Sequence, residues 1–70
     1  MYYTKITSNS HDVLATNKTD MLCSAVNFAN KKTNTGDNVD IYEAVERPEI
    51  RSVILIQRVM SWTDDGWSEE

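Results

Sequence analysis

The stretch IRSVILIQRVMSW, residues 50–62, decides the fold of this 70-residue chain. It contains the longest apolar run of the sequence, VILI at 53–56, and five of its residues are Ile or Val. Branching at Cβ restricts side-chain rotamers in a helix and suits the pleated surface of a strand. We therefore predict that residues 50–62 form the central strand of a small sheet.

This predicted strand has large apolar side chains on both faces, because successive residues point to opposite sides. One set contains Ile50, Ile54, Ile56 and Met60, and the other contains Val53, Leu55 and Val59. A single helix covers only one face, so the other is covered by something else or stays exposed as an adhesive patch. The second face could be covered by a second subunit, by a partner protein, or by the tail and tyrosines of the chain itself.

The segments before the helix predict a first hairpin. YYTKIT at 2–7 is rich in residues that favour strands, and Tyr2, Thr4 and Ile6 share one face. The polar residues at 8–11 indicate a turn, because their side chains bond readily to nearby backbone groups. Residues 12–16 then form a short second strand.

Residues 17–33 predict the one helix. Apolar residues recur there at spacings of three and four, at Met21, Leu22, Ala25, Val26 and Ala29, with Phe28 at the margin of the stripe. Asn17 can cap the first turn, supported by Asp20. Lys31 and Lys32 suit the last turn, and Asn34 or Gly36 can end the helix in the left-handed conformation.

A second hairpin follows the helix. VDIYEAVE at 39–46 alternates apolar and polar residues, with Glu43 as an interruption, and residues 47–49, Arg-Pro-Glu, connect it to the strand at 50–62. We expect Glu43 and Glu46 to pair across this hairpin with Arg51 or Arg58.

The predicted fold is α+β, in the order ββαββ, with a four-stranded, mainly antiparallel sheet and one helix packed on one face. Residues 1–62 form a single domain, and residues 63–70 form an acidic C-terminal tail. Trp67 in that tail either packs back onto the domain or is exposed as an anchor for a partner, and we expect it to fold back.

Composition and charge restrict the class of protein. The chain is 40% hydrophobic and 26% charged, as globular domains are, and its net charge is −4. Residues 1–35 carry +2 and residues 36–70 carry −6, so the acidity belongs to the second half. An acidic surface disfavours nucleic-acid binding. We find no apolar run of signal-peptide or membrane-span length, and expect a cytoplasmic protein with no membrane association.

Catalytic and metal-binding patterns were sought and not found. Cys23 is the only cysteine and His11 the only histidine, which is too few for a disulfide or a zinc site. The apolar neighbours of Cys23 predict a small buried residue rather than a nucleophile. Two glycines cannot form a glycine-rich phosphate loop, and the acidic clusters at 37–40 and 64–65 lack the spacing of a calcium loop. We therefore expect no enzymatic activity and no cofactor.

The order of elements resembles that of small bacteriophage host-takeover proteins. The resemblance covers about residues 2–60 and rests on VLA at 13–15, NKTD at 17–20 before a helix with Ala25 and Ala29, and VDIY at 39–42 entering a strand pair. It implies a protein of the host cytoplasm that binds and inhibits a host enzyme, frequently one acting on nucleic acid, through a charged sheet face or strand edge. No functional residue carries over, because no specific motif is shared.

The leading hypothesis is a small acidic binding protein that engages and inhibits a macromolecular partner, possibly as a nucleic-acid mimic. Its predicted contact surface consists of Asp40, Glu43, Glu46, Glu49, Asp64, Asp65 and Trp67. The carboxylates would occupy a basic groove on a nucleic-acid enzyme, and reversal of Glu43 and Glu46 to Lys would abolish binding. The alternative is a self-assembling homodimer. A third hypothesis, a nucleic-acid binder, uses Lys5, Lys18, Lys31, Lys32 and the tyrosines.

Overall fold

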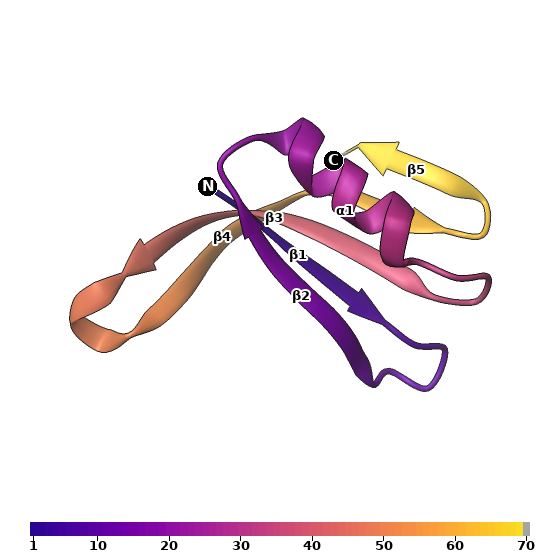
Figure 1. The fold of residues 1–70 in the computed structure, drawn as a ribbon, viewed down its shortest axis with the longest axis horizontal. Coiled ribbons are helices and arrows are strands. Elements are labelled where there is room, and N and C mark those ends of the chain that lie inside the picture. Colours follow the sequence, from indigo (N-terminus) through magenta and orange to yellow (C-terminus); the bar gives the residue numbers. More distant parts are fainter. Residues whose placement is uncertain (70) are drawn as a thin grey trace.

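A computed structural model describes residues 1–69 and shows one helix on a five-stranded antiparallel sheet (Figure 1). The strand order in the sheet is β2-β1-β3-β4-β5. In sequence the elements are β1 (Tyr2–Thr7), β2 (Val13–Thr19), α1 (Leu22–Lys32), β3 (Asn38–Arg47), a 3₁₀ turn (Pro48–Ile50), β4 (Ser52–Thr63) and β5 (Gly66–Glu69). The α+β class and the single helix are confirmed. The sheet has five strands rather than the predicted four, because residues 66–69 add a strand beside β4.

The first hairpin is longer than predicted. β1 has the predicted bounds, but β2 continues to Thr19, which lies opposite Tyr2 in the sheet. Asn17 is part of β2, where it lies opposite Thr4 of β1, and therefore does not cap the helix. Pairing with β1 supplies partners for the backbone of 17–19, and this outweighs the helical signal of the sequence. The helix begins five residues later than predicted, after Met21, whose side chain makes no capping bond.

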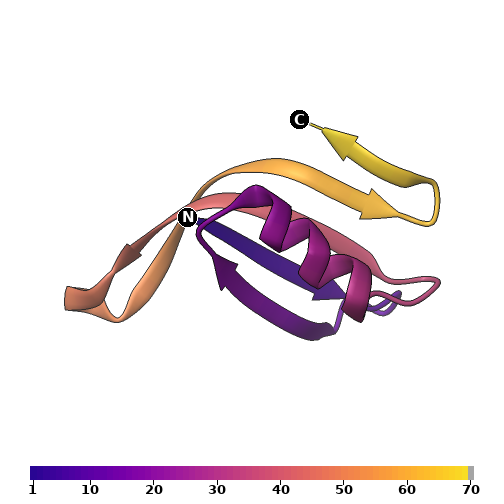
Figure 2. The same cartoon turned by 45° about the horizontal axis from the view of Figure 1, so that its top comes forward.

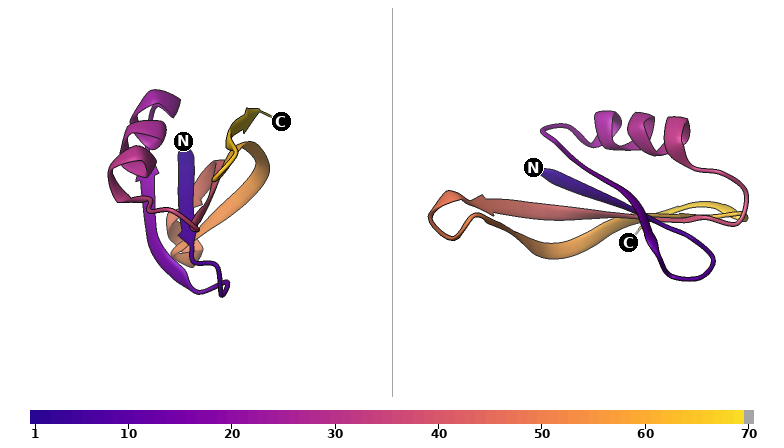
Figure 3. Two further views of the ribbon diagram at one scale, coloured as in Figure 1. Left: turned by 90° about the vertical axis from the view of Figure 1, so that its right-hand side faces the viewer. Right: turned by 60° about the horizontal axis from the view of Figure 1, so that its bottom comes forward.

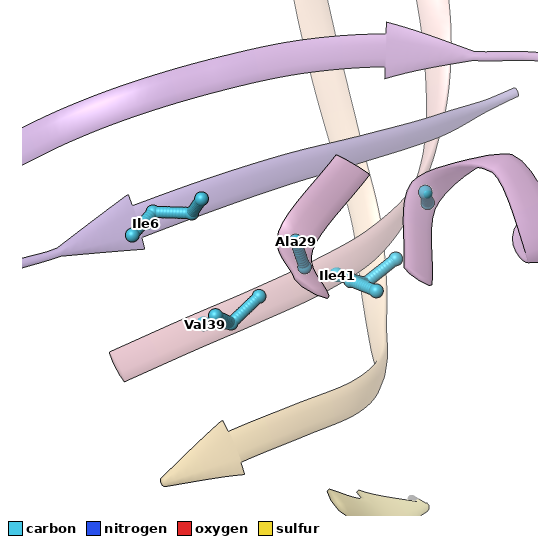
Figure 4. Close-up of a cluster of buried hydrophobic side chains, with 5 residues drawn as sticks. Ile6, Ala29, Val39 and Ile41 are labelled. Carbon is cyan, nitrogen blue, oxygen red and sulfur yellow. The ribbon is translucent and has the colours of Figure 1, made fainter. Parts of the chain in front are cut away.

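The core lies between α1 and the centre of the sheet. Ala25 and Ala29 are buried against Ile6, Val39 and Ile41, and their small side chains let the helix approach the strands closely (Figure 4). The rest of the predicted stripe is less buried. Leu22, Val26 and Phe28 pack at the margin of this core, whereas Met21 lies before the helix and is exposed.

The helix ends close to the predicted residue but without the predicted left-handed cap, because Thr33 at the C-cap is extended, with φ −88° and ψ 134°. Lys31 and Lys32 lie in its last turn, where cations oppose the partial negative charge of the carbonyl end. Gly36 then adopts a positive φ of 93° in the connection to β3. Cys23, in contrast, is exposed on α1, so the expectation of a buried cysteine is wrong. The buried side of the helix follows Ala25 and Ala29, and Cys23 falls outside it.

The β3–β4 hairpin is the longest element of the fold and extends beyond the other strands (Figures 1 and 3). Two register shifts place extra residues, Ile56 and Val59, in β4 opposite β3. Such bulges bend a strand and increase its twist. Residues 45–59, which we call the arm, pair in the sheet with neither β1 nor β5. The pairing of β1 with β3 starts at Tyr2 opposite Glu43, and the pairing of β5 with β4 stops at Glu69 opposite Met60.

Residues 64–69 of the predicted tail fold back, as predicted, and Glu70 lies outside the described residues. Asp64 and Asp65 form the turn between β4 and β5, and Trp67 on β5 lies opposite Trp62 on β4. Both tryptophans pack against the core. Gly66 has a φ of 110°, a conformation that glycine adopts without strain. Figure 2 shows α1 over one face of the sheet, with β5 at the edge next to β4 and the arm projecting away from both.

Candidate functional site

The arm exposes a group of large apolar side chains. Its exposed members are Val45, Ile50, Ile54, Leu55 and Ile56, with relative exposures from 37% to 61%. They include three of the four residues of the apolar run at 53–56 that decides the fold. The prediction that residues 50–62 form the central strand is wrong, because β3 occupies the centre of the sheet, and eight of these 13 residues are exposed. The sequence left open whether the second face of this strand is covered; in the arm, apolar side chains of both faces are exposed.

Geometry explains why the helix does not cover the arm. An α-helix of 11 residues is about 16 Å long, whereas the protein extends 37 Å along its longest axis. The helix packs on β1 and β2 and on the buried residues of β3, and the arm continues past it (Figure 2). Val45 illustrates the result. It shares a face with the buried Val39 and Ile41 but is 37% exposed.

The face of the sheet opposite the helix is polar and carries ion pairs. Asp40 on β3 pairs with Arg58 on β4 at 3.3 Å, and Lys18 on β2 pairs with Glu46 on β3 at 3.0 Å. Lys5 on β1 lies over the ring of Tyr42, with its Nζ 5.9 Å from the ring centroid. We call this surface the helix-free face. Its two carboxylates are each neutralised by a neighbouring cation.

An open groove of about 460 Å³ lies where the arm meets the helix-free face. It is lined by Tyr3, Lys5, Arg51, Ser52, Val53 and Leu55. Its lining thus contains two cations, one aromatic ring and two aliphatic side chains, and no carboxylate. A second hollow of about 350 Å³ adjoins it, shares Arg51, Ser52 and Val53, and reaches the Lys18–Glu46 ion pair.

Sheet register explains how residues far apart in sequence meet in this groove. Tyr3 pairs with Tyr42, and Leu55 pairs with Ala44, two residues further along the same face of β3. Ala44 is buried, and its small side chain leaves room between the larger neighbours. The groove is therefore built from β4 and β1, which lie on either side of β3.

The structure disperses the predicted acidic contact surface along the molecule. Glu46 and Glu49 lie towards the tip of the arm, whereas Asp64 and Asp65 lie in the β4–β5 turn at the other end (Figure 1). Glu49 is exposed in the 3₁₀ turn. These carboxylates do not form one patch.

Several of the predicted contact residues have structural partners. Asp40 pairs with Arg58, and the Glu43 carboxylate accepts a hydrogen bond from Gln57 at 3.1 Å. The Asp64 carboxylate accepts a hydrogen bond from the backbone N–H of Gly36 at 2.9 Å. Trp67 is half-buried against the core. The expected pairing of Glu46 with an arginine across the hairpin is replaced by its pairing with Lys18 on β2.

Sequence reasoning identified part of the groove for another purpose. Lys5 and the tyrosines belonged to the nucleic-acid hypothesis, and Arg51 was expected to pair with a glutamate. No local signal joins Tyr3 and Lys5 to Arg51, since they lie more than forty positions apart. Their meeting depends on the register of three strands and on the bend of β4.

Two other kinds of site are absent from the described residues, 1–69. This part of the chain has no cluster of three or more His, Cys, Asp or Glu side chains placed to hold a metal ion. Its one helix, of 11 residues, is too short to span a membrane. Comparison with protein-family models, with curated proteins and with solved structures finds no significant match to this chain.

Proposed function

We propose that this protein is a non-enzymatic binding protein that engages another protein through its arm. The observation that supports the proposal most directly is the exposure of Val45, Ile50, Ile54, Leu55 and Ile56 on a projecting two-stranded element. Several large apolar side chains exposed on one projecting element of a small protein mark a surface that is buried on association.

The energy available from this surface is substantial for so small a protein. Complete burial of a Val, Leu or Ile side chain contributes about 1.5–3 kcal/mol, and these residues are already about half buried. Covering all five would therefore contribute roughly 5 kcal/mol before the costs of association. That is comparable to the total stability of many small domains, which is about 5–15 kcal/mol.

The backbone of the arm supports the same function. Residues 45–47 of β3 and 52–59 of β4 have no neighbouring strand on their outer sides among the described residues. Unpaired strand edges can accept a strand from a partner. The bulges at Ile56 and Val59 interrupt the edge of β4, so we place the main contact on the apolar side chains rather than on backbone pairing.

A contact made by carboxylates alone has less support. Asp40 and Glu46 are held in ion pairs, and Asp64 bonds to the backbone of Gly36. Reversal of Glu43 and Glu46 to Lys remains the test of the acidic surface. Unchanged affinity after this reversal would agree with a contact centred on the apolar arm.

The proposal is tested with two matched baits in a pull-down from a lysate of the source organism. Ile54→Asp with Ile56→Asp places two charges on the arm, and Val13→Asp with Leu14→Asp places the same charges on exposed apolar residues of β2. All four positions are exposed, so both variants should keep the fold. We expect one stoichiometric protein that the wild-type and the β2 variant retain and the arm variant loses.

Sedimentation of the purified protein distinguishes binding to another protein from the alternative, self-assembly. A dimer that only the arm variant dissociates would assign the arm to a second copy of the chain instead. A monomer whose captured proteins do not differ between the two variants would refute the proposed function.

A further inference from the structure

We propose that the groove between the arm and the helix-free face binds an extended acidic segment of the partner protein, with an aliphatic side chain between its carboxylates. This inference rests on the proposed function and specifies the chemistry of the partner. Two features of the groove support it: two cations without an ion-pair partner, and aliphatic walls. The acidity of the rest of the molecule restricts the acidic ligand to a short segment.

The cations of the groove differ from the others on the same face. Arg58 and Lys18 are paired with Asp40 and Glu46, at 3.3 Å and 3.0 Å. Lys5 and Arg51 line the groove and make no ion pair within 4 Å with a carboxylate of residues 1–69; Asp40, opposite Lys5 in the sheet, is bound by Arg58 instead. The Nζ of Lys5 lies over Tyr42, which holds the charge on the face of the sheet. Two positive charges are thus available to carboxylates of a ligand.

The walls of the groove favour a peptide that also carries an apolar residue. Leu55 is 42% exposed, and Val53 and the ring of Tyr3 lie beside it. A leucine-sized side chain placed among them would bury apolar surface on both molecules.

The same charges argue for a protein ligand and against a nucleic acid. The chain has a net charge of −4, and a phosphate backbone that extends past the groove would meet Glu46 and Asp40 on the same face. A short acidic peptide needs only the two cations of the groove. A single-stranded oligonucleotide therefore serves as the competing ligand in the test.

The inference is tested by fluorescence anisotropy at low salt with a short fluorescein-labelled peptide in which glutamates flank a leucine. Lys5→Gln with Arg51→Gln removes the two cations of the groove. Lys31→Gln with Lys32→Gln removes the same charge from the end of α1 and is the matched control. We expect the first pair to weaken binding about tenfold or more and the control pair to change it less than about twofold.

A second variant tests the apolar part of the groove. Leu55→Ser keeps the charge of the groove and should lower the affinity for the peptide about fivefold, because the leucine of the peptide loses its contact. The same peptide with Gln in place of Glu should bind weakly to every variant. Circular dichroism confirms that each variant keeps the sheet.

Some results would overturn the inference. If the Lys5 and Arg51 variant and the Lys31 and Lys32 variant lose peptide affinity equally, the effect is one of general charge and not of the groove. Tighter binding of the oligonucleotide than of the peptide would assign the groove to nucleic acid. A natural partner that is lost by the Ile54 and Ile56 variant but retained by the Lys5 and Arg51 variant would refute the groove and leave the proposed function intact.

Discussion

Trp62 and Trp67 lie directly opposite each other on β4 and β5, and both pack against the core beneath α1. The C-terminal residues are therefore part of the sheet. A strand of only four residues is held in place by this pair of rings and by the pairing of 60–63 with 66–69. The contact also removes Trp67 from the exposed position that a partner anchor would need.

Replacement of Trp67 by Ala should destabilise the protein. The half-buried ring contributes apolar burial and a cross-strand contact with Trp62, so we expect a loss of about 2 kcal/mol in the free energy of unfolding. Urea denaturation followed by circular dichroism measures this without depending on tryptophan fluorescence. Ser68→Ala, at the exposed neighbouring position, is the control and should change stability by less than about 0.5 kcal/mol. Equal stability of the two variants would mean that β5 does not support the core.

Asp64 should be important for stability and Asp65 should not. The Asp64 carboxylate bonds to the backbone N–H of Gly36 at 2.9 Å and so joins the β4–β5 turn to the connection before β3. Asp64→Ala should cost about 1 kcal/mol in the free energy of unfolding, since an N–H group loses its charged acceptor. Asp65→Ala removes the same charge from the neighbouring position and should have little effect on the melting temperature. A larger loss for Asp65 than for Asp64 would contradict this assignment.

A capping residue at the start of α1 should stabilise the protein. Met21 occupies the N-cap position in an extended conformation, and its side chain cannot accept a hydrogen bond from the first turn. Met21→Ser should stabilise the protein by about 1 kcal/mol, because a hydroxyl at this position can accept a bond from a free N–H group. Met21→Ala removes the thioether without adding an acceptor and is the control. If thermal unfolding shows the same midpoint for both variants, the helix gains nothing from a cap at this position.

Thr4 is a buried polar residue, and removal of its hydroxyl should stabilise the protein. It is fully buried in β1, and its Oγ1 has no hydrogen-bond partner among residues 1–69. Thr4→Val should raise the free energy of unfolding by about 1 kcal/mol, because the burial cost of the hydroxyl disappears. Thr16→Val on β2 is the matched change at an exposed position and should be nearly neutral. A destabilised Thr4→Val variant would show that the hydroxyl is satisfied in solution.

Residue periodicity and composition were sufficient for most of the elements. β1 was predicted at its observed bounds, and β3 was predicted to within one residue at each end. The buried alanines of α1 also followed from sequence, because a 3.6-residue stripe is a local property. The predicted left-handed cap at Asn34 or Gly36 was wrong, since the helix ends at the extended Thr33.

The start of the helix was predicted wrongly for a physical reason. Asn17 and Asp20 suit a helix N-terminus in isolation, but residues 17–19 gain sheet partners across from Tyr2, Tyr3 and Thr4. That competition depends on a strand elsewhere in the chain, so local propensity cannot resolve it. The fifth strand was missed for the same reason, since its pairing with β4 requires the tail to turn back at Asp64 and Asp65.

The sequence by itself determined the fold class, the one helix and the existence of a strand with apolar residues on two sides. Only the tertiary structure decided which of those residues are covered. The helix is too short to reach the arm, and neither β1 nor β5 pairs with residues 45–59, so Ile54, Leu55 and Ile56 are exposed. Strand register and the two bulges of β4 bring Lys5 and Arg51 to one groove. Burial and proximity depend on how whole elements pack, and no local pattern of residues encodes them.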